Sequence, residues 1–207
     1  MRNFLKFLPR GPKATSGSAS RGSYRAKSQS GLAAVEFALI APVMIFAFFA
    51  AIEGASAFAA GRRASNAAHM LADIVAQEME IEAAALNDLF VGVSSVVNPT
   101  SNALPSGSTV TFTAVSLEVD PDTNKIVVGW SRDSAGAEPY AVGTEYTKVS
   151  ATIVDPNASL VVAEIDYNYV PPLTKTLLPF VNFQFQAVRR PRRASAVRFC
   201  ASPGNCI

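Results

Sequence analysis

The chain has 207 residues, enough for one domain together with an anchor or a tail. Only 16% of its residues are charged and its mean hydropathy is +0.22, whereas ordinary globular chains carry about 25% charged residues. The net charge of +2 conceals a basic head, an acidic body over residues 64–188 and a basic tail. These features argue against an ordinary soluble domain.

Residues 9–30 are rich in Ser, Gly, Pro and basic side chains. Such a segment offers too little apolar surface to offset the entropy lost on ordering, so we expect residues 1–31 to form a disordered leader. A basic arm that binds nucleic acid is the alternative. The apolar run that follows immediately favours a membrane-flanking leader, and no nucleic-acid partner is expected.

Residues 32–60 form an apolar run in which only Glu36 and Glu53 are charged. Because about 20 apolar residues cross the hydrocarbon layer of a bilayer, the run predicts one transmembrane helix. Seven basic residues precede it and two follow it directly, which by the positive-inside rule places the N-terminus in the cytoplasm. We therefore expect a single-pass protein of the bacterial inner membrane, with the lipid bilayer as a partner and the C-terminal domain in the periplasm.

A cleaved secretory signal peptide competes for the same run. Ala55-Ser56-Ala57 and Ala57-Phe58-Ala59 both satisfy a small-x-small cleavage rule. The run is longer than the usual hydrophobic region of about 7–15 residues, however, and Glu53 lies where such a cleavage region is uncharged. These two features favour the transmembrane helix.

Apolar residues continue to recur every three or four positions after Arg63, with no Gly or Pro before Gly92. This period predicts that residues 61–91 continue the helix as an amphipathic segment. Pro, Asn, Ser and Gly then predict a linker loop within residues 92–108.

Residues 109–190 are predicted to form an antiparallel β domain of about four or five strands, because they are rich in Val, Ile, Thr, Tyr and Phe and carry turn signals between the runs. The expected strands are residues 109–119, 125–131, 145–154, 159–170 and 182–188. A Pro-flanked crossover is expected at residues 171–181. The predicted fold class is thus α+β, a long N-terminal helix packed on an antiparallel sheet.

The last segment, residues 191–207, is a basic tail that contains both cysteines, Cys200 and Cys206. In an oxidising compartment this spacing favours a small disulfide loop, with free thiols as the alternative. A metal site is not expected, since the chain has no further Cys and His69 is its only His. Four arginines precede or begin the tail and are expected to pair with carboxylates of the domain, or else to contact another subunit: Arg189, Arg190, Arg192 and Arg193.

No catalytic or cofactor-binding motif is found, so neither an enzyme nor a small-molecule substrate is expected. Asp120, Asp122 and Asn124 resemble the start of a calcium loop. The sixth position is Lys125 where the loop needs Gly, and the twelfth is Ser131 where it needs Glu. A β-turn is the better interpretation.

The start of the apolar run carries the most informative pattern. A basic leader ends at Gly31, the helix begins at Leu32, and Glu36 is the fifth residue after the Gly. Prepilin peptidases recognise this arrangement and cleave after the Gly. A carboxylate at the edge of a bilayer is costly and is normally paired or functional, and here it can meet the new α-amino group of a neighbouring subunit. The alternative is a Glu36 that reaches the headgroups and has no further role.

Gly31 to Glu53 resembles the TadE/TadG-like family of the tight-adherence (Flp-type) pilus system. The Ala-rich segment 60–76 and the segments Asp166–Leu173 and Arg189–Arg192 resemble the same family. In its short length, the chain resembles the TadE/TadF pseudopilin-like members of that family. The resemblance implies a non-enzymatic minor component that assembles or anchors the pilus, with other pilus subunits and a prepilin peptidase as partners.

Small residues on the predicted span would allow close packing against neighbouring helices. These residues are Ala47, Ala50, Ala51, Gly54 and Ala57. The other hypothesis is a membrane-tethered periplasmic binding or scaffold module that is neither processed nor polymerised.

Overall fold

The computed structural model describes residues 30–98, 104–150, 159–173 and 180–206, and these divide into two units at Val43/Met44. The described residues of the first unit belong to helix α1 (Ser30–Val75). The second unit contains the rest of α1 and all other described elements. The predicted leader lies outside the described residues, apart from Ser30 and Gly31.

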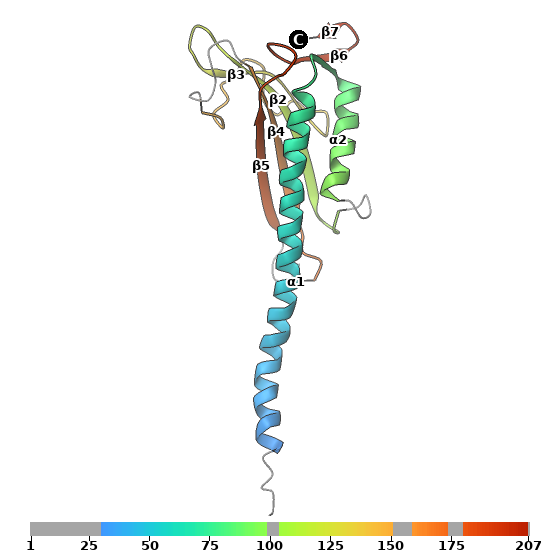
Figure 1. Cartoon of the computed structure of the whole chain (residues 1–207), viewed down its shortest axis with the longest axis vertical. Helices are drawn as coiled ribbons and strands as arrows, with labels where there is room; N and C mark the ends of the chain where they lie inside the picture. Colours follow the sequence, from blue (N-terminus) through green and yellow to red (C-terminus); the bar gives the residue numbers. More distant parts are fainter. Residues whose placement is uncertain (1–29, 99–103, 151–158, 174–179, 207) are drawn as a thin grey trace, which may run out of the picture. The chain divides into compact units, whose positions relative to one another are not determined.

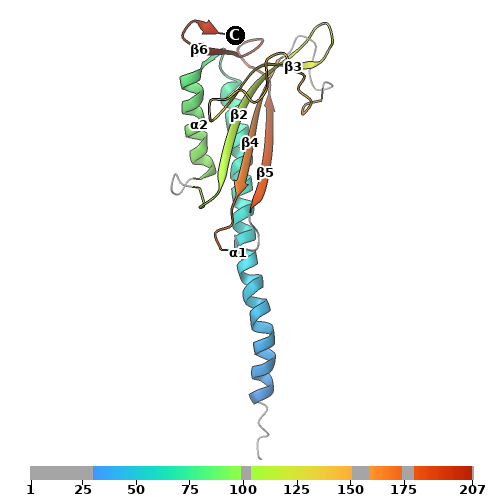
Figure 2. The same cartoon turned by 180° about the vertical axis from the view of Figure 1, so that it is seen from behind.

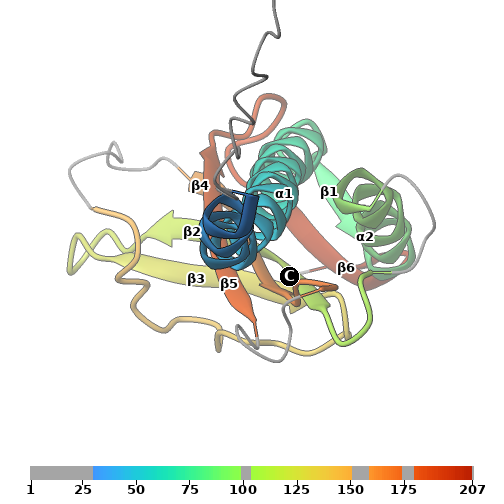
Figure 3. The same cartoon turned by 90° about the horizontal axis from the view of Figure 1, so that it is seen from below.

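A four-stranded antiparallel sheet forms the centre of the second unit. Its strands are β2 (Thr109–Val119), β3 (Ile126–Asp133), β4 (Ser159–Tyr169) and β5 (Val181–Arg189), in the order β3-β2-β4-β5. Helix α2 (Ala83–Val97) lies beside α1 on one face of this sheet (Figures 1 and 3). Figure 2 shows the sheet from its other face, in front of α1. The α+β prediction is confirmed.

The main core lies between the helices and the sheet. Along α1, small side chains allow the helix to approach the strands closely: Ala60, Ala64, Ala67, Ala68 and Ala72 are all buried there. A Cβ placed on Gly61 would lie 3.1 Å from Cε1 of Phe183 in β5. The Ala-rich sequence after the apolar run is therefore the surface that seats α1 on the sheet.

Helix α1 ends earlier than predicted. The sequence has no helix-breaking residue before Gly92, yet the chain leaves the helix after Val75 and forms β1 (Glu80–Glu82), a short strand that buries Ile81. Tail residues provide the reason, because Arg192 N–H donates to Ala76 O at 2.8 Å and Arg198 N–H to Met79 O at 3.1 Å. Hydrogen bonds from residues distant in the sequence thus replace the helical ones. The prediction of a single helix to residue 91 is wrong.

Two neighbouring expectations change with this break. Helix α2 runs to Val97, so residues 92–97, predicted as loop, are helical. The tail, for which no strand was predicted, forms β6 (Arg198–Ser202) and β7 (Asn205–Cys206). Strand β6 pairs in parallel with β1 and antiparallel with β7, giving a second, three-stranded sheet.

The strand expected at residues 145–154 is found only as an isolated bridge, Val127↔Glu145, within the part that the structure describes. Residues 143–146 instead run along the edge of β3, where Tyr146 N–H donates to Ile126 O at 2.9 Å. Residues 151–154 of that range, and 174–179 of the expected crossover, lie outside the described residues.

On the sheet face away from the helices, Glu164 connects the loop after β3 to β4. Its carboxylate accepts from Tyr140 at 2.6 Å, from Tyr146 at 2.5 Å and from Lys148 at 2.9 Å. Burial alone would raise the pKa of Glu164, but these three donors outweigh it and hold the pKa below its usual value. Burial, together with the hydrogen bond to Glu164, raises the pKa of Tyr146.

Replacing Glu164 by glutamine is therefore expected to lower the free energy of unfolding by about 1–2 kcal/mol at neutral pH. A carboxylate whose pKa is depressed by folding stabilises the protein above its unfolded-state pKa and loses that effect as the pH falls through the folded-state value. The difference between wild type and Glu164→Gln should accordingly vanish in acid. Urea unfolding of detergent-solubilised protein across pH measures this, with Asp166→Asn on the same strand and face as control. A difference that stays constant down to the lowest pH would contradict it.

Candidate functional site

The first part of α1 is apolar on every side. Within the described chain it is the one helix long and apolar enough to span a membrane. Its large side chains are exposed, among them Phe37 at 73%, Val43 at 67% and Phe46 at 62%. Each costs about 1.5–3 kcal/mol when left in water, so this surface requires an apolar environment.

The predicted processing residues lie in the first two turns of this helix. Leu32 and Glu36 are four residues apart, on one helical face, and both are exposed. Apart from its chain neighbours and the backbone of α1 itself, no described atom comes within 4 Å of a Cβ placed on Gly31. No other described element therefore covers Gly31.

The small residues predicted to pack against neighbouring helices follow along α1. Ala47, Ala50, Ala51 and Gly54 are exposed, and no described atom lies within 4 Å of a Cβ placed on Gly54. Ala57 differs, because it is half-buried and packs against the main core. The first four recur at spacings of three, one and three residues and therefore lie along one exposed face of α1.

Glu53 is the buried acid of α1, with only 6% of its surface exposed. Its Oε1 accepts a hydrogen bond from the backbone N–H of Leu173 at 2.5 Å, which holds the loop after β4 against the helix. Burial raises the pKa of nearby Tyr169, and the negative charge of Glu53 adds to that rise. This hydrogen bond joins α1 to the Tyr169–Leu173 segment after β4. Its two residues, Glu53 and Leu173, lie 120 positions apart in the sequence.

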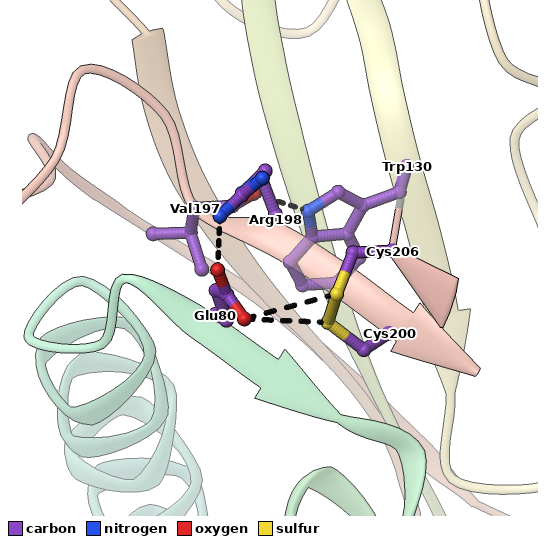
Figure 4. The surroundings of a disulfide bond; sticks show 6 residues. All are labelled: Glu80, Trp130, Val197, Arg198, Cys200 and Cys206. Atoms are coloured by element: carbon purple, nitrogen blue, oxygen red, sulfur yellow. Dashed lines mark hydrogen bonds and ion pairs between the residues drawn. A yellow bond between two sulfur atoms is a disulfide. The ribbon is translucent and has the colours of Figure 1, made fainter. Parts of the chain in front are cut away.

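Cys200 and Cys206 form a disulfide that links β6 to β7 (Figure 4). Glu80 of β1 lies beside it and forms an ion pair with Arg198. The carboxylate and the two sulfurs are close enough together to suggest a metal site. Since the sulfurs are bonded to each other, neither is the thiolate that a metal ion binds, and the group serves as a covalent clasp.

The indole of Trp130 connects this clasp to the large sheet. Its Nε1–H donates to Val197 O at 2.6 Å, and its ring lies 5.5 Å from that of Phe199. The guanidinium of Arg132 lies 4.6 Å from the centre of the Phe199 ring, on which it stacks. The tail is therefore held both by β1 and by side chains of β3.

The arginines before the tail reach α1. Arg189 Nε lies 2.7 Å from Asp73 Oδ1, and Arg192 Nη2 lies 3.3 Å from the same atom. This pairing agrees with the expectation that the arginines meet carboxylates of the domain. Arg190 and Arg193 are exposed.

Removing the clasp with Cys200→Ser and Cys206→Ser is expected to lower the free energy of unfolding by about 2 kcal/mol, given the short closed loop. Because Trp130 abuts Phe199, its fluorescence in a urea titration reports on the same region. Ser202→Ala in the same strand is the control. Two free thiols in the denatured, unreduced wild-type protein would contradict the clasp.

Sequence reasoning did not identify the Glu53–Leu173 contact, the Trp130–Val197 contact or the position of Glu80. Each joins residues more than 60 positions apart, and no local pattern encodes such a pair. Two signals were present: Glu53 is an acid within an apolar run, and Trp130 is the only tryptophan.

Comparison with known proteins gives one positive result. The family model described as TadE-like protein matches residues 31–73, nearly the whole of α1. No curated protein and no solved structure is significantly similar to the chain. The matched range includes Gly31, Glu36 and Glu53 and ends at Asp73, the partner of Arg189. Over residues 31–73, the chain is thus similar to the TadE-like protein family.

Proposed function

We propose that the protein is a non-enzymatic, pseudopilin-like minor component that assembles or anchors a Flp-type (tight-adherence) pilus. The observation that carries the proposal is the TadE-like match over a helix that is long and apolar enough to span a membrane. In this proposal α1 anchors the protein in the inner membrane. A prepilin peptidase releases the leader after Gly31, and the exposed strip of small residues contacts other subunits.

The chemistry of the helix supports an assembling role. Cleavage at Gly31 would create an α-amino group four residues before Glu36, and the same pair in a neighbouring copy would offer a complementary charge. Between packed helices, away from water, such a pair fixes the register in which they associate. The exposed Ala and Gly residues farther along α1 let two backbones approach closely.

A membrane-tethered periplasmic scaffold module is the second candidate. It is favoured by the second unit, which has its own core between α1, α2 and the sheet. The two candidates share the anchor and differ in processing and assembly.

The topology that both need is tested with a reporter that is active only in the periplasm. Fused after Ile207 it should be active, and fused within the leader after Lys27 it should be inactive. The protein should also stay in the membrane pellet during alkaline extraction. Recovery of the full-length chain in the soluble fraction would contradict both candidates.

A further inference from the structure

The connection between β4 and β5 carries exposed apolar side chains next to α1. Leu173 is 60% exposed and Phe180 is 58% exposed. The hydrogen bond from Leu173 N–H to Glu53 holds one end of the connection at the helix. The other end leads into β5, whose Phe183 touches Gly61. Figures 1 and 2 show the described ends of this connection beside α1, at the end of the sheet from which β5 starts.

Another side of the helix carries an exposed apolar side chain about one and a half turns after Glu53. Phe58 is 66% exposed, and the guanidinium of Arg62 lies 5.7 Å from the centre of its ring. At about 100° and 1.5 Å per residue, Phe58 lies about 140° around the helix from Glu53 and about 7.5 Å farther along it, and Arg62 lies on the side opposite Glu53, about 14 Å farther along. Exposed apolar side chains therefore lie on two sides of α1 near the point where it meets the sheet, with the Arg62 guanidinium beyond them.

This level is also where the apolar run ends. Glu53 is the first charged residue after Glu36, and Arg62 and Arg63 follow. An apolar surface that continues a membrane span and stops at a cation has the pattern of a bilayer interface, where apolar side chains enter the acyl boundary and arginine reaches the phosphates.

We propose that Phe58, Arg62, Leu173 and Phe180 form an interfacial girdle, by which the periplasmic domain itself contacts the bilayer surface. The three apolar side chains insert below the headgroups, and Arg62 binds phospholipid phosphate. The proposal rests on the membrane anchoring proposed above and adds a second contact, made by the domain. A single helix leaves a domain free to tilt, whereas a second contact through Leu173 and Phe180 restricts that tilt.

The buried Glu53 contributes to this arrangement as a hydrogen-bond acceptor. A segment that enters the interface must satisfy its backbone donors within the protein, because the acyl region offers no acceptor. Glu53 accepts from the N–H of Leu173, the residue that would enter. Its carboxylate thus lets Leu173 lie against the bilayer without an unpaired N–H.

The test uses tryptophan probes in the full-length protein, reconstituted in vesicles that contain phosphatidylglycerol and brominated lipids. Leu173→Trp, Phe180→Trp and Phe58→Trp should lose fluorescence, most strongly with bromines near the headgroup. Val142→Trp is the matched control, since Val142 is also 60% exposed but lies in the loop after β3. Phe46→Trp reports on the span and should be quenched by deeper bromines. The signal of the native Trp130 is measured in the parent protein and subtracted.

The outcomes separate the girdle from the anchor. Quenching at Leu173, Phe180 and Phe58 but not at Val142 supports the girdle. Quenching at Phe46 alone overturns the girdle and leaves the anchor intact, whereas no quenching at Phe46 overturns the anchor. The Leu173 and Phe180 probes could instead be protected from aqueous iodide and yet not be quenched by bromine. That result would show that another protein covers these positions, and it would also overturn the girdle.

Discussion

Replacing Gly31 by leucine is expected to leave the protein in the membrane as an uncleaved precursor, heavier than the mature form by the mass of residues 1–31, and to abolish piliation. The proposed cleavage needs a small residue before the scissile bond, and Gly31 in the first turn of α1 is such a residue. An uncleaved leader would keep seven positive charges on the helix that has to enter an assembly. Those charges would gather at the ends of neighbouring helices, where they repel one another, and the blocked N-terminus of Leu32 would leave Glu36 without the α-amino partner.

The measurement is the intact mass of protein isolated from membranes, together with a count of surface pili. Gly54→Leu is the matched control for cleavage, because Gly54 lies in the same helix and also has open space around it. It should be cleaved normally. A Gly31→Leu protein with the same mass as wild type would show that processing does not occur at this bond.

Replacing Glu36 by alanine is expected to leave cleavage and membrane insertion intact while assembly fails. In an isolated chain Glu36 lies on an exposed surface, and its loss removes no contact that the structure describes. Between helices it would pair with the α-amino group of a neighbouring subunit, a contact worth on the order of a few kcal/mol in a water-poor environment. Assembly should therefore lose a favourable contact that the single chain does not use.

Glu36→Asp keeps the negative charge on a shorter side chain and should partly restore assembly. Phe37→Ala, at the adjacent exposed position, is the control for a general change of helix surface. Pili in normal number on Glu36→Ala cells would reject a role for this carboxylate and favour the tethered scaffold module.

The parts of the fold that the sequence predicted well are those with a strong local pattern. The strand at residues 109–119 has the predicted limits, because Val110, Phe112 and Ala114 alternate with polar residues and turn signals follow. The strand predicted at 182–188 is observed as Val181–Arg189 for the same reason. The apolar helix was predicted from the length of the apolar run alone.

What the sequence did not reveal depends on partners that are distant in the chain. Helix α1 ends at Val75 because the tail supplies donors to Ala76 and Met79, and nothing near Val75 signals it. The tail has a defined structure because Trp130 donates a hydrogen bond to Val197 and Glu80 pairs with Arg198. The use of Glu53 as an acceptor for the segment after β4 likewise depends on where the sheet places Leu173.

The mature N-terminus of the wild-type protein, determined by mass spectrometry after isolation from membranes, tests the central proposal most directly. Prepilin-type processing predicts a chain that begins at Leu32 and retains Glu36 as its fifth residue. A chain that begins at Met1 would contradict it and leave a membrane-anchored domain without a role in pilus assembly. A chain that begins after Ala57 or Ala59 would indicate a cleaved signal peptide and would contradict the membrane anchor as well.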